Sequence, residues 1–171
     1  MAKLTKKKLL EHLGKSDKED VIREIMVLFD KFKNVKEFYA AELSNDENPL
    51  LEKYKKKITY AYSAENPKEK RTNMNVNKLI GEFKKVSIYE RDIADLMLHR
   101  VECGVEAFNG NNNRSATFYN CIANSFEEAI AIISTNDYLS EFRQRILKIV
   151  KNSKIAKFEV EARLRNIAKE I

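Results

Sequence analysis

Apolar residues recur every three to four positions along nearly the whole chain, which is the period of an amphipathic α-helix. Val21, Ile22, Ile25, Phe29 and Phe32 show it clearly. The pattern predicts helices at 5–13, 16–32, 35–43, 49–62, 76–86, 88–108, 115–133, 137–150 and 155–171. We therefore expect an all-α protein of about seven to nine helices, either an antiparallel bundle or a short stack of helical hairpins.

The predicted helix ends depend on local capping chemistry. Asn-Pro at 48–49 has the residue types of an N-cap followed by a first helical position. Ser-x-x-Glu at 16–19 and again at 87–90 has the spacing of a capping box. Gly14 is predicted to end the first helix in a left-handed conformation, and Asp137 to cap the helix that follows it.

One tract interrupts the periodic pattern. Residues 63–75 are polar and contain proline, so we expect a long loop or hinge there. A chain of 171 residues is long enough for one domain with a core, and we predict a single domain over 1–171. The alternative is a pair of sub-bundles, 1–62 and 76–171, joined by the loop at 63–75.

The composition indicates a soluble chain in a reducing compartment. Hydrophobic residues make up 43% and charged residues 34%, and no apolar run approaches the roughly 20 residues that span a bilayer. The N-terminus lacks the continuous apolar core of a signal peptide. Two cysteines without Cys-x-x-Cys spacing fit a reducing environment. We therefore expect a cytoplasmic protein with no membrane partner.

The basic residues are unevenly distributed. Residues 53–85 hold ten Lys and Arg against three Asp and Glu, and tyrosines lie among them. Such a segment could neutralise phosphates while the tyrosines stack on unpaired bases. The alternative is a solvated helix face followed by a basic loop, with the tyrosines half buried. The candidate polyanion-binding residues are Lys53, Lys55, Lys56, Lys57, Lys68, Lys70 and Arg71, with Tyr54, Tyr60 and Tyr62.

Metal-ligating residue types gather on one predicted helix. Asp95, His99, Glu102, Cys103 and Glu106 follow the helical period. A di-iron bundle uses Glu-x-x-His on two helices, whereas this helix carries the reverse order without a second copy. We therefore expect no metal site, and a solvated acidic face with one histidine instead.

The two cysteines pose a separate question. A hairpin centred near residue 112 would place Cys103 and Cys121 at the same height, where they could form a redox pair. Equal height does not make the side chains face each other, and a free cysteine usually acts as a small buried hydrophobe.

Catalytic signatures are not found. The chain has no G-x-S-x-G, H-E-x-x-H, phosphate-binding glycine loop or dinucleotide fingerprint. We expect a non-enzymatic helical adaptor or scaffold, with no cofactor and no identified small-molecule substrate. Its partner would be a protein or a second copy of the chain, and nucleic acid binding through residues 53–85 is the alternative.

Several segments resemble an uncharacterised group of small bacterial proteins, the domain-of-unknown-function family 6155. They include Asp-Val-Ile-Arg-Glu-Ile-Met-Val-Leu-Phe-Asp-Lys-Phe at 20–32 and Phe-Tyr-Asn-Cys-Ile-Ala-Asn-Ser-Phe-Glu-Glu-Ala at 118–129. The remaining ones are 3–13, 35–39, 80–87 and 94–108. The resemblance implies a helical bacterial protein and assigns no role to any residue.

Overall fold

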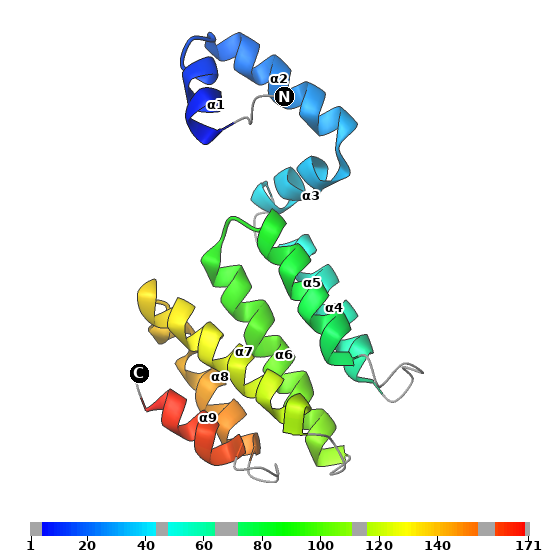
Figure 1. Cartoon of the computed structure of the whole chain (residues 1–171), viewed down its shortest axis with the longest axis vertical. Coiled ribbons are helices and arrows are strands. Elements are labelled where there is room, and N and C mark those ends of the chain that lie inside the picture. The colour runs from blue at the N-terminus through cyan, green and yellow to red at the C-terminus, as the bar shows by residue number, and fades with distance from the viewer. Residues whose placement is uncertain (1–4, 44–47, 64–71, 111–115, 154–159, 170–171) are drawn as a thin grey trace. The chain divides into compact units, whose positions relative to one another are not determined.

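The computed structural model describes residues 5–43, 48–63, 72–110, 116–153 and 160–169. These residues form nine helices and no strand, so the all-α prediction is confirmed (Figure 1). The chain divides into two compact units, Met1–Asn45 and Asp46–Ile171, which we call unit 1 and unit 2. The segment 63–75 that was predicted as a hinge lies within unit 2, and residues 64–71 of it are outside the described part.

Unit 1 consists of α1 (Lys6–Leu13), α2 (Lys18–Lys31) and α3 (Lys33–Glu42). Thr5 caps α1, because its hydroxyl accepts a hydrogen bond from the Lys8 N–H at 3.4 Å. Asp17 caps α2 by accepting from the Asp20 N–H at 2.8 Å. Phe29 of α2 lies 6.4 Å from Tyr39 of α3, measured between ring centroids, and this pair helps to join the two helices.

Three predicted details of unit 1 are wrong. Ser16 does not cap α2, because its hydroxyl donates to the His12 carbonyl and Asp17 takes the cap position. Gly14 is right-handed, with φ −69°, so it does not end α1 by the left-handed route. The break between α2 and α3 falls at Phe32, whose backbone is extended, and Asn34 is already inside α3.

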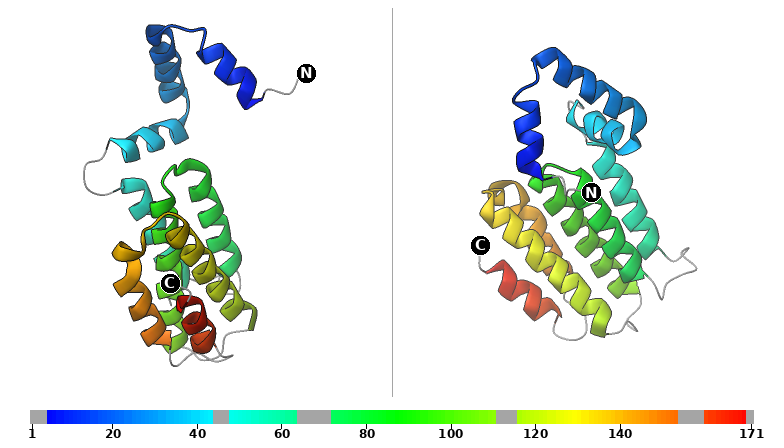
Figure 2. Two further views of the ribbon diagram at one scale, coloured as in Figure 1. Left: turned by 90° about the vertical axis from the view of Figure 1, so that its left-hand side faces the viewer. Right: turned by 45° about the horizontal axis from the view of Figure 1, so that its top comes forward.

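Unit 2 consists of α4 (Pro49–Tyr62), α5 (Thr72–Val86), α6 (Glu90–Gly110), α7 (Ala116–Thr135), α8 (Leu139–Asn152) and α9 (Val160–Ala168). Helix α6 is central, because it contacts α4, α5, α7 and α8 (Figures 1 and 2). Helix α9 packs against α7 and α8. The arrangement is a bundle of antiparallel neighbours, as the helical-hairpin pattern predicts.

The core of unit 2 lies along α6 and α7. Leu96 and Val101 of α6 and Ile122 and Phe126 of α7 are fully inaccessible to solvent. Burial of such side chains from water is the main source of stability in a bundle. Polar residues also lie inside, since Asp92, Asp95, Arg100, Ser125 and Ser153 are buried.

The capping of α4 agrees with the prediction, and three other helix ends differ. Asn48 accepts hydrogen bonds from the backbone of Leu50 and Leu51, and Pro49 is the first residue of the helix. Helix α6 spans Glu90–Gly110, whereas the predicted helix covers 88–108. Helix α5 begins at Thr72, so part of the predicted 63–75 loop is helical.

The turn after α7 is formed in a different way from the one predicted for Asp137. Asp137 does not cap α8 but adopts a left-handed conformation, with φ 57°. The Tyr138 N–H then donates to the Ile133 carbonyl at 3.0 Å, which is the long bond of a Schellman motif. Asp137 thus serves the end of α7 in a position that glycine usually fills.

Candidate functional site

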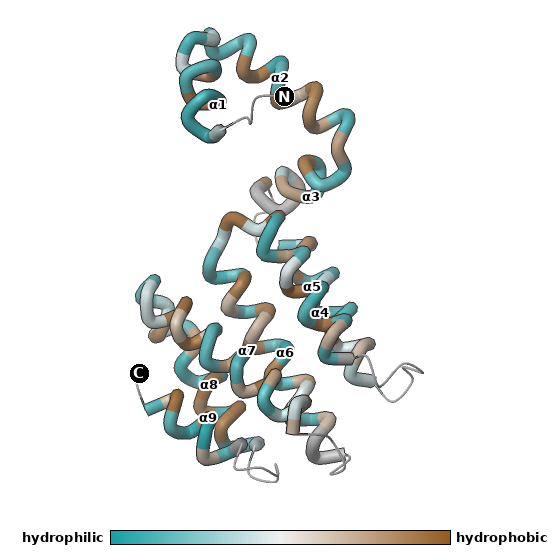
Figure 3. The backbone as a smooth tube through the Cα atoms, in the orientation of Figure 1, coloured by the Kyte–Doolittle hydropathy of each residue, from teal (hydrophilic) through white to brown (hydrophobic). Residues whose placement is uncertain are grey.

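Unit 1 presents an unusual number of large apolar side chains to solvent. No side chain of α1 or α2 is buried. Hydrophilic and hydrophobic residues alternate along α2 (Figure 3). The exposed residues, which we call the apolar surface of unit 1, are Leu9, Leu10, Ile22, Met26, Val27, Leu28, Phe32 and Leu43, each 45–77% accessible.

The basic segment of the sequence is only partly a free surface. Lys53 and Lys56 of α4 are exposed. Lys57 is exposed too, and its ammonium lies 4.8 Å from the centroid of the Tyr54 ring. Lys55 was predicted on the same exposed face but is mostly covered, and it binds the carboxylates of Glu52 and Asp95 at 3.0 Å each. The other candidates, Lys68, Lys70 and Arg71, lie outside the described residues.

The tyrosines of this segment differ in accessibility. Tyr54 is buried and packs on Phe83 with ring centroids 5.3 Å apart. Tyr62 is half buried, and burial raises the pKa of its phenol. Only Tyr60 of the three is exposed, at 56%. Of the predicted stacking residues, Tyr60 therefore has a ring available to an unpaired base.

A charge network joins α4, α6 and α8 at one side of the bundle. Arg145 of α8 holds Glu102 in a bidentate pair, with both N–O distances 2.8 Å. The same guanidinium binds the Asp95 carboxylate at 2.5 Å and the Asp95 carbonyl at 3.3 Å. Lys55 completes the network from α4. The predicted solvated acidic face is therefore wrong at Asp95 and Glu102, because both carboxylates are neutralised by basic residues of other helices.

The network fixes the protonation states of its members. Burial alone would raise the pKa of the Asp95 carboxyl, but the hydrogen bonds and charges of Arg145 and Lys55 outweigh it, so this pKa is below its usual range. The pKa of Arg145 is raised, because its pairs with Glu102 and Asp95 outweigh the opposing effect of burial. Asp95 and Arg145 therefore stay charged over a wide pH range.

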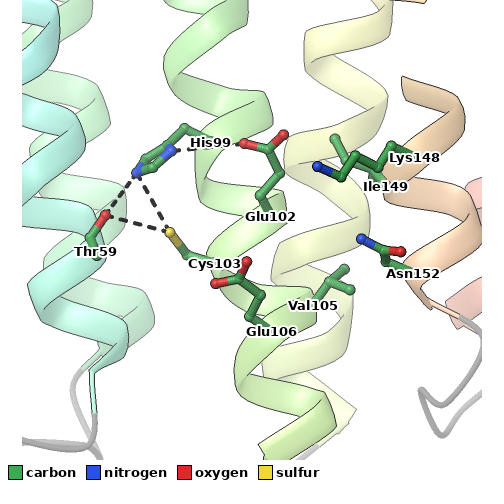
Figure 4. Close-up of a pocket in the computed structure, with 9 residues that line it drawn as sticks. All are labelled: Thr59, His99, Glu102, Cys103, Val105, Glu106, Lys148, Ile149 and Asn152. Carbon is green, nitrogen blue, oxygen red and sulfur yellow. Dashed lines mark hydrogen bonds and ion pairs between the residues drawn. The ribbon is translucent and has the colours of Figure 1, made fainter. Parts of the chain in front are cut away.

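A pocket of about 350 Å³ lies beside this network (Figure 4). Thr59 of α4 and His99 and Cys103 of α6 point toward one another at one end of it. The His99 Nε2 lies 2.9 Å from the Thr59 hydroxyl and 3.5 Å from the Cys103 sulfur, and its Nδ1 lies 3.8 Å from the Glu102 carboxylate. The rest of the lining consists of Val105 and Glu106 of α6 and Lys148, Ile149 and Asn152 of α8.

Cys103, His99 and Glu102 follow one another in the order in which a histidine and a carboxylate activate a cysteine thiol. The pKa values of Cys103 and His99, however, oppose formation of a thiolate. Burial raises the pKa of the Cys103 thiol to about 11. Burial also lowers the pKa of His99. Near pH 7 both groups are therefore neutral, and Glu102 is committed to Arg145. This is the protonation state of a structural cysteine and not that of a thiolate nucleophile.

The other residue types predicted on this helix take separate roles. Glu106 is exposed at the pocket, whereas Asp95 is held by Lys55 and Arg145. In the described part of the chain no three His, Cys, Asp or Glu residues are grouped so that they could hold a metal ion. Cys103 and Cys121 are both free thiols, the first buried and the second half buried.

Thr59 and Arg145 belong to this site and were missed by the sequence analysis. Arg145 carried a usable signal, because it shares the buried stripe of α8 with Phe142, Ile146 and Ile149. A charged residue inside an apolar stripe normally has a partner of opposite charge. Thr59 carried no such signal, since threonine is common on solvated helix faces.

None of the helices in the described ranges is long and apolar enough to cross a membrane. Searches of curated proteins and of solved structures find no match to the chain. A match over residues 1–170 is found with DUF6155, described as a family of unknown function. Because that match spans nearly the whole sequence, as the segments of the sequence analysis suggest, the chain belongs to the DUF6155 family.

Proposed function

We propose that the chain is a non-enzymatic helical adaptor that associates with a second copy of itself through the apolar surface of unit 1. The observation that carries the proposal is the exposure of that surface, in a unit whose helices α1 and α2 bury no side chain. Exposed apolar residues gathered in one small unit of a protein usually mark an interface. Unit 2 has its own core, and in the dimer it would be the part available to other macromolecules.

The size of unit 1 supports association. Segments of about 40 residues rarely bury enough surface to fold alone, and they normally depend on disulfides, metals or oligomerisation. Unit 1 spans 45 residues and contains no cysteine, so a disulfide within it is impossible. A partner surface that covers its apolar residues would supply the missing burial.

Charge complementarity favours a second copy over an unrelated partner. The start of α2 is acidic on balance, with Asp17, Glu19 and Asp20 beside Lys18, and its far end is basic on balance, with Lys31 and Lys33 beside Asp30. If two α2 helices pair antiparallel, the acidic end of each meets the basic end of the other. A twofold interface repeats this contact twice, which fixes the orientation of the two copies.

Sedimentation equilibrium of the full chain at physiological salt tests the proposal. We expect a dimer for the wild type and a monomer for Ile22→Glu and for Met26→Glu. Leu147→Glu is the matched control, because Leu147 is 53% exposed but lies on α8 of unit 2, and this variant is expected to remain dimeric. A wild type that is monomeric up to about 100 µM would remove the proposal, since a functional interface is tighter than that.

A charge swap tests the antiparallel arrangement. The pair Glu19→Lys with Asp20→Lys should weaken the dimer, and so should Lys31→Glu with Lys33→Glu. The fourfold variant should restore it, because the opposite charges again face each other. Additive weakening in the fourfold variant would show that the acidic and basic ends do not meet.

A second candidate function is nucleic acid binding through residues 53–85. The favouring observation is that Lys56, Lys57 and Tyr60 of α4 are exposed together. Fluorescence anisotropy with a labelled single-stranded oligonucleotide at several salt concentrations tests it. Weak binding without a salt dependence would remove this candidate, because phosphate contacts release counterions.

We propose that the chain works in the bacterial cytoplasm. The two free thiols support that location, because extracellular proteins with exposed or paired cysteines usually form disulfides. Fractionation of the native host with an antibody against the chain tests the assignment.

A further inference from the structure

Arg100 is a buried cation in the centre of unit 2. It lies on α6 and is 3% exposed. Its Nη1 donates to the Asn77 carbonyl oxygen and to the Ser125 hydroxyl, both at 2.7 Å, and its Nε lies 3.4 Å from the Tyr62 hydroxyl. The guanidinium therefore joins α4, α5, α6 and α7 through three neutral side chains.

The described residues around Arg100 do not balance its charge. No ion pair to a carboxylate is found for it among the residues that the structure describes. Its Nη2 is buried and has no hydrogen-bond partner. Arginine keeps its proton in proteins, so burial leaves both an uncompensated positive charge and an unused donor. Such a group is strongly destabilising unless an anion meets it.

The residues that accept hydrogen bonds from Arg100 also carry donor hydrogens of their own. Ser125, Asn77 and Tyr62 each receive a hydrogen bond from Arg100 on their oxygen, so their own O–H and N–H hydrogens remain for another acceptor. The Tyr62 hydroxyl has one alternative acceptor, the Asn73 carbonyl oxygen, at the long distance of 3.5 Å. Burial raises the pKa of Tyr62, which keeps the phenol protonated as a donor.

The residues that accept hydrogen bonds from Arg100 differ in their exposure to solvent. Ser125 is 4% exposed and lies deep in the bundle, but Tyr62 is half buried and Asn77 is exposed. These hydrogen-bond partners, on α4, α5 and α7, thus range from a buried residue to an exposed one. Oxyanions suit this set better than a halide, because two oxygens on one centre match the fork of a guanidinium.

We propose that Arg100, with Ser125, Asn77 and Tyr62, binds the carboxylate or phosphate group of a small anionic ligand. The anion neutralises the buried guanidinium and accepts the Nη2 hydrogen bond. This site is in unit 2 and does not depend on the self-association of unit 1. Binding of the anion stabilises unit 2, because the folded state alone holds the donors together.

Isothermal titration calorimetry of the full chain tests the proposal by measuring affinity. Inorganic phosphate and acetate are the probes, and chloride at equal ionic strength is the reference. We expect phosphate or acetate to bind and chloride to bind far more weakly. Stronger binding of phosphate points to a phosphorylated ligand, and stronger binding of acetate to a carboxylic acid. Failure of both oxyanions to bind would overturn the proposal.

Variants distinguish this site from general attraction to anions. Ser125→Ala removes one donor but keeps the charge, and we expect about tenfold weaker binding. Arg100→Met should lose binding altogether, and circular dichroism will show whether it folds. Arg143→Met removes an exposed arginine of α8 and should bind like the wild type. Unchanged affinity in Ser125→Ala and Arg100→Met would show that the anions bind elsewhere.

Discussion

Gly104 of α6 lies directly against Ile122 of α7, so close that a Cβ added at residue 104 would come within 2.4 Å of the Ile122 Cδ1 and 2.9 Å of its Cγ1. A glycine inside a helix normally costs about 1 kcal/mol relative to alanine. Here the missing side chain lets the two longest helices of the bundle approach. Gly104 is therefore a packing residue.

Gly104→Ala is expected to destabilise unit 2 by about 1–2 kcal/mol, because overpacking outweighs the gain in helix propensity. Adding Ile122→Val removes the nearest carbon and should recover part of the loss, which a double-mutant cycle in urea measures. Gly81→Ala is the matched control. No atom lies within 4 Å of a Cβ at residue 81, so this variant should gain up to about 1 kcal/mol. A stabilised Gly104→Ala would contradict the close contact.

Arg145→Met is expected to cost about 2–3 kcal/mol at pH 7, since Asp95 and Glu102 lose their shared cation. The loss should depend on pH. Because the pKa of Asp95 is lowered in the folded state, its contribution is present above about pH 4, the pKa of an unfolded aspartate, and disappears as the pH falls through the folded value. Urea unfolding at several pH values should show the wild type and the variant converging in acid.

The control for that variant is an exposed ion pair. Arg165 and Glu161 of α9 are paired within one helix, and Arg165 is 54% exposed. Arg165→Met should change the free energy of unfolding by less than about 0.5 kcal/mol. Equal losses in the two arginine variants would mean that the network of Arg145 contributes no more than a surface pair.

Much of the fold follows from the period of apolar residues, since each of the nine helices in the described ranges overlaps a predicted one. Observed and predicted helix ends differ where one residue type is compatible with two local structures. Phe32 continues the apolar stripe of α2 and yet adopts the extended backbone that ends the helix. Asp137 has the residue type of an N-cap and acts as the left-handed residue after α7. Local sequence rules do not distinguish these alternatives, because tertiary packing decides between them.

The site was less predictable than the fold. The sequence predicted Asp95, Glu102 and Lys55 to be solvated charges, because helical spacing says nothing about which helix packs opposite. Their partner Arg145 lies 43 residues from Glu102 and 50 from Asp95. The pairing of α4, α6 and α8 creates the network, and only a prediction of that packing could have found it.

Asn48 offers a test of the contact between the start of α4 and α6. Its carbonyl oxygen caps α4, and its amide donates to the buried Asp92 carboxylate at 2.6 Å. Asn48→Ala should cost about 1–2 kcal/mol, for the cap and for the lost hydrogen bond. Asn48→Asp keeps a capping oxygen but places two carboxylates together. That variant should be destabilised at pH 7 and recover as one carboxyl is protonated in acid.

The reactivity of Cys103 decides whether the pocket beside His99 contains an activated thiol. With a pKa of about 11, about one thiol in a thousand is ionised at pH 8, and the side chain is 7% exposed. In the Cys121→Ser variant we therefore expect iodoacetamide to modify Cys103 far more slowly than it modifies glutathione, with a rate that keeps rising above pH 9. The half-buried Cys121, followed by mass spectrometry in Cys103→Ser, should react faster. Rapid modification of Cys103 at pH 7 would show that His99 does activate the thiol, and it would favour an enzyme over an adaptor.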